Sequence, residues 1–186
     1  MTDLGLMHYF LGIEIAQFED GIFIAEKKYT TSLLKKFKME GCKTVATPLG
    51  SNKSLRIEDG TPKADSSQFQ SLIGSLLYLT VTRPDIISAK RILRYLQGTK
   101  DYGIRYQSTP NSRLLGYTDS DWAGSVDDTK GTSSYTFTLG FRIFSWTSKK
   151  QATVTQSLAK AEYIAVAMAT SQALWLKRIL EDIGER

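Results

Sequence analysis

The pattern of hydrophobic and polar positions switches along the chain between the two-residue period of strands and the longer period of helices. Residues 9–16 are rich in aromatic and β-branched side chains and alternate apolar with polar positions, which predicts a strand. Turn-forming residues at 19–21 separate this run from a second apolar run at 22–24. The two runs together predict a β-hairpin.

Helical spacing follows in three segments. From Lys27 onward, apolar residues recur beneath a row of lysines, and Gly41 marks the end of a basic amphipathic helix. A second helix is expected over 66–80, with these side chains buried: Phe69, Leu72, Ile73, Leu76, Leu77 and Leu79. A third is expected over 86–96, with Ile92, Leu93 and Leu96 inside and Lys90, Arg91 and Arg94 toward solvent. Residues 42–64 are expected to form an extended connection and 82–85 a turn.

The later part of the chain has mainly the pattern of strands. A short strand is expected at 103–107, and the runs at 113–118, 133–139 and 141–146 predict a meander of antiparallel strands. Apolar residues then recur mostly every three or four positions over 157–183, which predicts one long helix. The fold class expected from these elements is α+β.

A short apolar run leads into four carboxylates in residues 116–128, GYTDSDWAGSVDD. Asp119 and Asp121 are two residues apart, so in an extended chain both would project from one face. Carboxylates gathered at the end of a buried strand repel one another and lose hydration, so either a cation or an exposed turn is expected. A calcium-binding loop is disfavoured, because Lys130 occupies the twelfth position, where a glutamate is needed.

Glu162 extends the metal-site hypothesis to the last helix. It lies at the edge of the apolar stripe, so a helix packed across the meander could present it to Asp119. Carboxylates from different elements that hold two Mg²⁺ ions are what a metal-dependent nuclease requires. The alternative, equally open from these residues alone, is that Glu162 is an ordinary boundary residue of an amphipathic helix.

Composition narrows the class of protein. The 186 residues suffice for one domain or two small ones, and 41% of them are hydrophobic. The single cysteine, Cys42, excludes an internal disulfide, and the single histidine, His8, argues against Cys/His zinc sites and histidine triads. Most of the net charge of +5 lies before Ser112. Basic side chains on a helix face are typical of phosphate contact, although a solvated helix face explains such runs more often. Because no membrane span or signal peptide is evident, an intracellular location, cytoplasmic or nuclear, is expected.

Seven blocks of sequence, in this order, resemble the Pol polyproteins of copia-type LTR retrotransposons. The blocks are YFLGIEI, CKTVATPL, SLIGSLLYLTVTRPDI, AKRILRYLQGT, GYTDSDWAG, FSWTSKKQ and AEYIAVA. They cover nearly the whole chain. The resemblance implies that residues 1–110 are the C-terminal part of a reverse transcriptase, with the end of the palm, the thumb and the connection. Residues 111–186 would then be a truncated ribonuclease H-like domain of three antiparallel strands and a long helix.

The resemblance also implies roles for individual residues. Asp119 corresponds to the first catalytic aspartate of the ribonuclease H site and Glu162 to its glutamate, with Mg²⁺ as the cofactor. Asp121, Asp127 and Asp128 are expected to be ordinary loop acids. An RNA/DNA hybrid is the implied partner, and these residues are expected to contact nucleic acid: Tyr9, Gly12, Lys35, Lys36, Lys38, Lys90, Arg91 and Arg94.

The sequence departs from the family in four places. The polymerase aspartates of the family lie upstream of this start, and a helical stretch that the family has near residues 86–88 is missing. Lys160 stands where the family usually has the first of two glutamates. Positions 160 and 162 are about 200° apart around a helix, so only one of them can face Asp119. If the catalytic glutamate is the second, Lys160 points away from the site; if it is the first, the site has lost it. The chain also stops at Arg186, before the remaining carboxylates of the family's site.

These departures predict a fragment that is catalytically inactive alone. Asp119 and Glu162 would supply two of four expected ligands, too few to hold two Mg²⁺ ions against water. Residual nucleic-acid binding is expected. The alternatives are a non-enzymatic interaction protein, whose partner completes the truncated sheet, or an unselected relic of a transposon.

Overall fold

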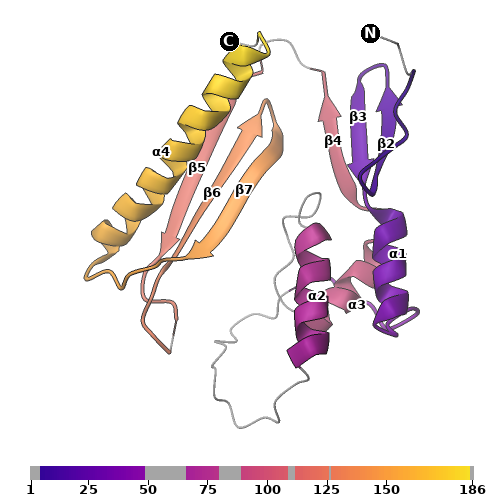
Figure 1. Cartoon of the computed structure of the whole chain (residues 1–186), viewed down its shortest axis with the longest axis horizontal. Helices are drawn as coiled ribbons and strands as arrows, with labels where there is room; N and C mark the ends of the chain where they lie inside the picture. Colours follow the sequence, from indigo (N-terminus) through magenta and orange to yellow (C-terminus); the bar gives the residue numbers. More distant parts are fainter. Residues whose placement is uncertain (1–4, 49–65, 80–88, 109–111, 126, 185–186) are drawn as a thin grey trace. The chain divides into compact units, whose positions relative to one another are not determined.

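The computed structural model describes residues 5–48, 66–79, 89–108, 112–125 and 127–184 and divides them into two compact units (Figure 1). The described residues up to Ser108 form unit 1, and those from Ser112 onward form unit 2. Each unit combines antiparallel strands with helices, which confirms the α+β class. The predicted boundary at residue 110 lies outside the described residues, and the identity of the two predicted domains stays a prediction.

Unit 1 contains a four-stranded antiparallel sheet in the order β1-β2-β3-β4. The strands are β1 (Tyr9–Phe10), β2 (Ile13–Phe18), β3 (Gly21–Ala25) and β4 (Gly103–Gln107). The prediction of one continuous strand over 9–16 is wrong, because Leu11 and Gly12 adopt left-handed φ values of 47° and 87°. The chain therefore folds back, and β1 pairs with the start of β2.

Gly12 is fixed in this turn by its backbone and by a neighbour. A two-residue turn with both φ values positive matches the twist of a hairpin. A Cβ at position 12 would collide with the Tyr78 hydroxyl, which donates a hydrogen bond to the backbone oxygen of Leu11. Tyr78 also packs against Tyr29, with ring centroids 4.5 Å apart. The hairpin is thus held against the helices of unit 1.

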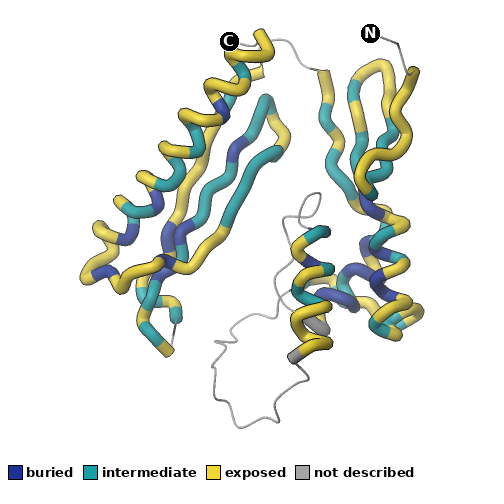
Figure 2. The backbone as a smooth tube through the Cα atoms, in the orientation of Figure 1, coloured by how far each residue is buried: buried dark blue, intermediate teal, exposed yellow. Residues whose placement is uncertain are grey.

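The helices of unit 1 are α1 (Lys27–Lys36), α2 (Ser66–Leu79) and α3 (Ala89–Gly98), and they enclose one hydrophobic core (Figure 2). The core residues are Leu33, Leu34, Leu76, Leu79, Ile92, Leu93 and Leu96. Burial of Phe69 and Leu77 was wrongly predicted, since they are 50% and 63% exposed. Of the apolar residues of α2, Leu76 and Leu79 lie in the core and Leu72 packs against it, so fewer side chains are buried than the sequence pattern predicts. The expected turn at 82–85, the start of the third helix at 86–88 and residues 49–64 of the connection lie outside the described residues.

Unit 2 is a three-stranded antiparallel sheet covered on one face by a long helix. The strands, in spatial order, are β5 (Leu114–Asp121), β6 (Thr132–Leu139) and β7 (Arg142–Lys150), and the helix is α4 (Leu158–Asp182). The predicted meander and long helix are confirmed. Ala161 and Ala165 of α4 are fully buried, and such small side chains let the helix approach β5 and β6 closely. The side chain of Ser157 caps the helix by accepting a hydrogen bond from the backbone N–H of Lys160.

Among the helices that the structure describes, none combines the length and the apolar character that crossing a bilayer requires.

Candidate functional site

A buried glutamine joins the sheet of unit 2 to its helix. Gln151 follows β7 and is only 5% exposed. Its side-chain Nε2 donates one hydrogen bond to Ser133 Oγ, at 2.8 Å, and another to the backbone oxygen of Ala161, at 3.1 Å. Ser133 lies in β6 and pairs directly with Ser120 of β5. These contacts, called here the Gln151 clamp, hold the first turn of α4 above the C-terminal end of β5.

The clamp brings the elements that carry Asp119 and Glu162 to one end of unit 2. Asp119 immediately precedes Ser120 in β5, and Glu162 immediately follows Ala161 in α4. Both acids are therefore next in sequence to residues of the clamp region. Figure 1 shows the arrowhead of β5 and the start of α4 at the same end. Leu114 and Leu180 line a common groove at the opposite end, so α4 runs antiparallel to β5.

The side chains of Asp119 and Glu162 do not lie on the same side of the sheet. Cross-strand partners share a face, so Ser120 lies with Ser133 on the face beneath α4. Side chains alternate along a strand, so Asp119 projects from the opposite face, where it is exposed. Glu162 is half-buried on α4. No described residue forms a hydrogen bond with either carboxylate.

The carboxylates at this end do not by themselves fit a two-metal site. In the described residues, no group of three or more His, Cys, Asp or Glu side chains is arranged to hold a metal ion. Two Mg²⁺ ions need carboxylates from several elements, in addition to water and substrate oxygens. The catalytic and metal-binding roles of Asp119 and Glu162 therefore remain predictions.

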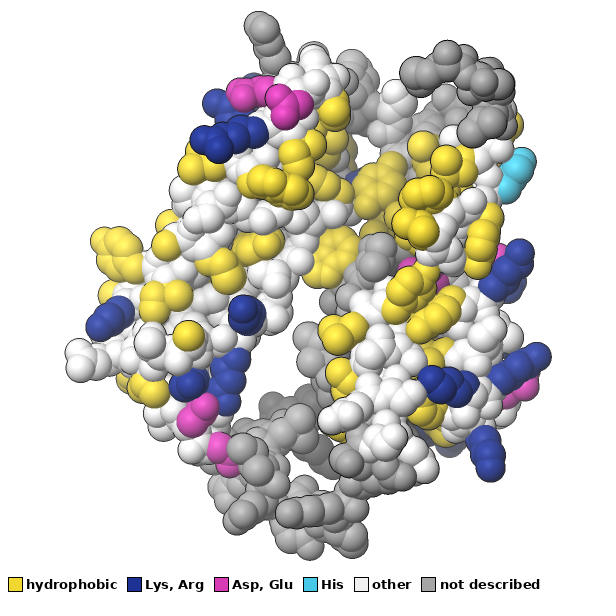
Figure 3. Space-filling model, viewed as in Figure 1, with side chains coloured by type: hydrophobic (Ala, Val, Ile, Leu, Met, Phe, Trp, Pro, Cys, Tyr) yellow, Lys and Arg dark blue, Asp and Glu magenta, His cyan; other side chains and the backbone are white. Residues whose placement is uncertain are grey.

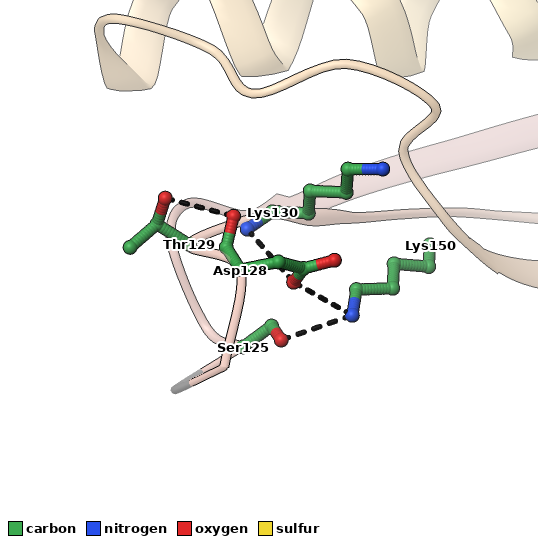
Figure 4. Close-up of polar contacts among 5 residues, drawn as sticks. All are labelled: Ser125, Asp128, Thr129, Lys130 and Lys150. Carbon is green, nitrogen blue, oxygen red and sulfur yellow. Dashed lines mark hydrogen bonds and ion pairs between the residues drawn. The ribbon is translucent and has the colours of Figure 1, made fainter. Parts of the chain in front are cut away.

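Asp128 anchors the loop between β5 and β6 (Figure 4). Lys150 Nζ forms an ion pair with Asp128 Oδ1 at 2.7 Å and donates a hydrogen bond to Ser125 Oγ at 3.0 Å. The backbone N–H of Lys130 also donates to Asp128 Oδ1, at 3.4 Å. The hydrogen bond from Lys150, helped by Ser125, lowers the pKa of the Asp128 carboxyl to about 2. Asp128 is thus a loop acid, as expected, but one that organises the loop around it.

A tryptophan contact holds the other side of this loop. Trp122 Nε1 donates a hydrogen bond to the backbone oxygen of Thr155, at 2.9 Å, in the connection between β7 and α4. Sequence reasoning missed both Trp122 and Gln151. Both residues fall within the blocks that resemble the family, at positions to which the resemblance gave no role. Their location in these blocks was the only feature of the sequence that could have pointed to them.

The lysines predicted to bind nucleic acid lie around the end of α1. Lys35, Lys36 and Lys38 are all exposed. Lys36 Nζ donates to Ser71 Oγ of α2, at 2.8 Å, and Lys35 lies 3.9 Å from a carboxylate oxygen of Glu40. Exposed ion pairs of this kind are weak, so these ammonium groups are available to an anionic partner.

The arginines of α3 make internal contacts instead. Arg91 donates to the backbone oxygen of Thr47 at 3.0 Å and to its hydroxyl at 2.9 Å. Arg94 donates to the backbone oxygen of Lys43 at 2.8 Å. Both guanidinium groups therefore tie the segment after α1 to α3. Lys90 lies in α3, but its side chain is outside the described residues.

Tyr9 and Gly12 occupy the hairpin end of unit 1. Tyr9 is 54% exposed, and the Lys28 ammonium lies 5.3 Å from the centre of its ring. Gly12 forms the turn beneath Tyr78. The structure thus gives Gly12 a conformational role, and its expected contact with a primer strand stays a prediction.

Known proteins resemble the chain over most of its length. The retrovirus-related Pol polyprotein from transposon RE2 of Arabidopsis thaliana is 37% identical and covers 96% of the chain. The corresponding polyprotein from transposon TNT 1-94 of Nicotiana tabacum is 33% identical and covers 99% of it. An uncharacterized mitochondrial protein of Arabidopsis thaliana is 35% identical over 94% of the chain, which spans 80% of that protein. The chain belongs to the family of copia-type retrotransposon Pol polyproteins, which confirms the resemblance.

The chain corresponds to a small part of those polyproteins. It spans 14% of the length of the RE2 polyprotein and 16% of the TNT 1-94 polyprotein. No protein-family model and no solved structure matches the chain. The comparisons therefore establish the family and not the activity of this segment.

We predict that Asp128→Asn lowers the urea midpoint of unit 2 at neutral pH, because the substitution removes the ion pair with Lys150. The folded pKa of about 2 lies below the ordinary value of 3.8, so the stabilisation is complete above the ordinary value. It is lost as the pH falls through the folded value. All three tryptophans, Trp122, Trp146 and Trp175, lie in unit 2, so their fluorescence reports on this unit alone. The unsubstituted chain and the variant should converge near pH 2, and a difference that does not change with pH would contradict the assignment.

Proposed function

We propose that this segment joins the reverse transcriptase and ribonuclease H parts of a copia-type Pol polyprotein, and that alone it binds nucleic acid without cleaving it. The observation that carries the proposal is the antiparallel packing of α4 over β5, which brings the elements bearing Asp119 and Glu162 to one end of unit 2. The family membership of the chain makes the ribonuclease H assignment the natural one.

The architecture of unit 2 supports the ribonuclease H assignment. The resemblance implies three antiparallel strands followed by a helix, with an aspartate near the end of the first strand and a glutamate early in the helix. Unit 2 has this order of elements, with Asp119 in β5 and Glu162 in the second turn of α4. Asp121, which was expected to be a loop acid, is instead the last residue of β5, so the choice of Asp119 over Asp121 rests on the resemblance.

The proposed lack of cleavage follows from the sparse donor set. Hydrolysis of a phosphodiester requires that metal ions stabilise the charge on the phosphate and activate a water molecule. Mg²⁺ loses its bound water molecules reluctantly. Two carboxylates that project from different faces cannot replace enough of these water ligands to hold the ion. The Mg²⁺ that the family implies would need further carboxylates.

The proposed binding rests on the lysines of α1. Figure 3 shows Lys and Arg side chains on the surface of unit 1. Contacts from such side chains to phosphates position a nucleic acid but do not read its sequence. Arg91 and Arg94 each donate to a backbone oxygen of the segment after α1, whereas Lys36 donates only to the hydroxyl of Ser71, and no described hydrogen bond holds the side chain of Lys35 or Lys38. Lys35, Lys36 and Lys38 are therefore the side chains that we expect to contact phosphates. Binding should then be independent of sequence and strongly dependent on salt.

A second candidate function, protein interaction, is favoured by the sheet of unit 2. Within the described residues β5 pairs with β6 alone, so one edge of the sheet is open to a further strand. A protein partner that completes this sheet would make the segment an interaction module. This function does not exclude nucleic-acid binding by unit 1.

We predict that the chain binds a labelled RNA/DNA hybrid with an affinity that falls steeply with salt. Each phosphate contact contributes about 0.9 to the slope of log affinity against log salt concentration. Fluorescence anisotropy should show that the combined change of Lys35, Lys36 and Lys38 to Gln reduces this slope by about 2 to 3. The matched control changes three exposed lysines of unit 2 to Gln, namely Lys149, Lys160 and Lys177, and should have a smaller effect. A slope near zero for the unsubstituted chain would rule out the proposed binding.

For catalysis, we predict that the chain does not detectably cleave the RNA strand of the same hybrid in the presence of Mg²⁺. The physical reason is the incomplete donor set around Asp119 and Glu162. Gel analysis of the labelled RNA measures cleavage directly. Robust cleavage that Asp119→Asn abolishes would show that the site is complete, and cleavage that survives this substitution would indicate a contaminating nuclease.

A further inference from the structure

Three buried side-chain oxygens at one end of unit 2 have no hydrogen-bond partner among the described residues. They are Ser120 Oγ, Gln151 Oε1 and Thr155 Oγ1. The three residues are 9%, 5% and 3% exposed, so a further segment of the polyprotein could not reach these atoms from outside. Buried polar atoms in folded proteins are almost always bonded, either to the protein or to an ordered water molecule. Three such atoms at one end of a small unit therefore require an explanation.

Contacts around the end of β5 place Gln151 Oε1 close to Ser120. Ser120 pairs directly with Ser133, whose Oγ accepts the hydrogen bond from Gln151 Nε2. The backbone N–H of Gln151 donates to the backbone oxygen of Gly131, at 2.8 Å. A Cβ at Gly131 would approach Gln151 Oε1 to 3.1 Å and would collide with the backbone oxygen of Asp121, the residue after Ser120. The amide oxygen of Gln151 therefore lies beside the last residues of β5.

Thr155 reaches the same end from the connection between β7 and α4. Its backbone oxygen accepts a hydrogen bond from Nε1 of Trp122, two residues after Ser120. Gln151 begins this connection, and α4 begins three residues after Thr155. Figure 2 shows buried positions at this end of the sheet. The three oxygens thus come from β5 and from both parts of the connection, around one end of the sheet.

The chemistry of the Gln151 amide decides which ligand fits. The backbone oxygen of Ala161 can only accept, so the side-chain atom that it meets at 3.1 Å is Nε2 and the remaining atom is the oxygen. Oε1 therefore needs a donor. The hydroxyls of Ser120 and Thr155 can each donate one hydrogen bond and accept others. A ligand that both donates and accepts suits this set of atoms.

An ion suits the same atoms poorly. The carboxylates of β5, Asp119 and Asp121, alternate with Ser120 and project from the opposite face, so they would not balance the charge of a cation buried beside it. An anion would be repelled by Oε1, which is itself an acceptor. A water molecule is neutral, donates and accepts, and typically makes about three hydrogen bonds when it is buried in a protein.

We propose that one internal water molecule joins Ser120 Oγ, Gln151 Oε1 and Thr155 Oγ1. The described hydrogen bonds of the Gln151 side chain reach β6 and α4. The water molecule would extend them to β5, the strand that carries Asp119, and to the connection that leads into α4. Ser120 and Thr155 are then positioning residues for this end of unit 2. The inference rests on buried atoms and does not depend on nucleic-acid binding or catalysis.

Oxygen-17 magnetic relaxation dispersion tests the site directly, because it detects internal water molecules that exchange slowly with solvent. In Thr155→Val a methyl group replaces the hydroxyl, so this variant should hold one long-lived water molecule fewer than the unsubstituted chain. Thr153→Val is the matched control, since Thr153 is exposed in the same connection, and it should hold the same number as the unsubstituted chain. Tryptophan fluorescence verifies that each variant is folded.

Two results of this measurement would overturn the proposal. One is an equal number of long-lived water molecules in folded Thr155→Val and in the unsubstituted chain. The other is the absence of any long-lived internal water molecule from the unsubstituted chain, a result that requires no variant to fold.

A double-mutant cycle tests whether the two hydroxyls share a partner. Ser120→Ala and Thr155→Val should each raise the equilibrium constant for unfolding of unit 2 about five- to tenfold, measured by urea titration with tryptophan fluorescence. The two hydroxyls make no hydrogen bond to each other, so a common water molecule would couple them. The effect of the double variant should then fall short of the product of the single effects by more than about twofold. Agreement with that product within about twofold would contradict a shared water molecule.

Stability in different salts separates water from a bound cation. The water site predicts the same urea midpoint of unit 2 in sodium, potassium and tetramethylammonium chloride at equal ionic strength. A ligand that binds only the folded state raises stability with its concentration. A higher midpoint in sodium or potassium chloride that Thr155→Val removes would overturn the proposal in favour of a cation site.

Discussion

The hydrogen bonds of Gln151 are the constraint on which the arrangement of unit 2 depends. One amide group donates to β6 through Ser133 and to α4 through the backbone of Ala161, in a place where water has little access. Leaving buried acceptors such as these without donors costs about 1–3 kcal/mol. The fully buried Ala161 and Ala165 allow the helix close enough for the amide to reach both partners. The position of α4, and with it that of Glu162 relative to β5, follows from this clamp.

Unit 1 is held by contacts of the same kind. Tyr78 fixes the turn of the first hairpin, and Arg91 and Arg94 fix the segment that follows α1. These polar contacts separate the basic residues into two groups. The arginines of α3 maintain the structure, whereas the lysines near the end of α1 remain exposed to solvent. Positive charge in the sequence alone could not make that distinction.

The sequence predicts the long periodic elements well and long-range contacts poorly. α4 and the meander of β5, β6 and β7 follow from periodicity that extends over many residues. The turn at Gly12 was missed because it interrupts an apolar run without the usual polar turn residues. The pairing of β4 with β3 joins segments about 80 residues apart, and no local pattern specifies it.

In the candidate site, too, the sequence predicted the elements but not the contacts between distant residues. The proximity of the elements that bear Asp119 and Glu162 follows from packing a helix across a meander, and the sequence predicted it. The face from which Asp119 projects depends on the register of β5 against β6, which periodicity does not give. Gln151 resembles a surface residue in sequence, because its burial depends on α4 closing over it.

The most direct test of the account is amide hydrogen exchange at residues 158–166 in Gln151→Leu. Gln156→Leu is the matched control, since Gln156 is exposed in the same connection. The clamp predicts that Gln151→Leu speeds exchange in the first turns of α4 and lowers the stability of unit 2 by about 1–3 kcal/mol, while Gln156→Leu changes neither. Equal protection of these residues in the two variants would contradict the claim that Gln151 holds the helix on the sheet.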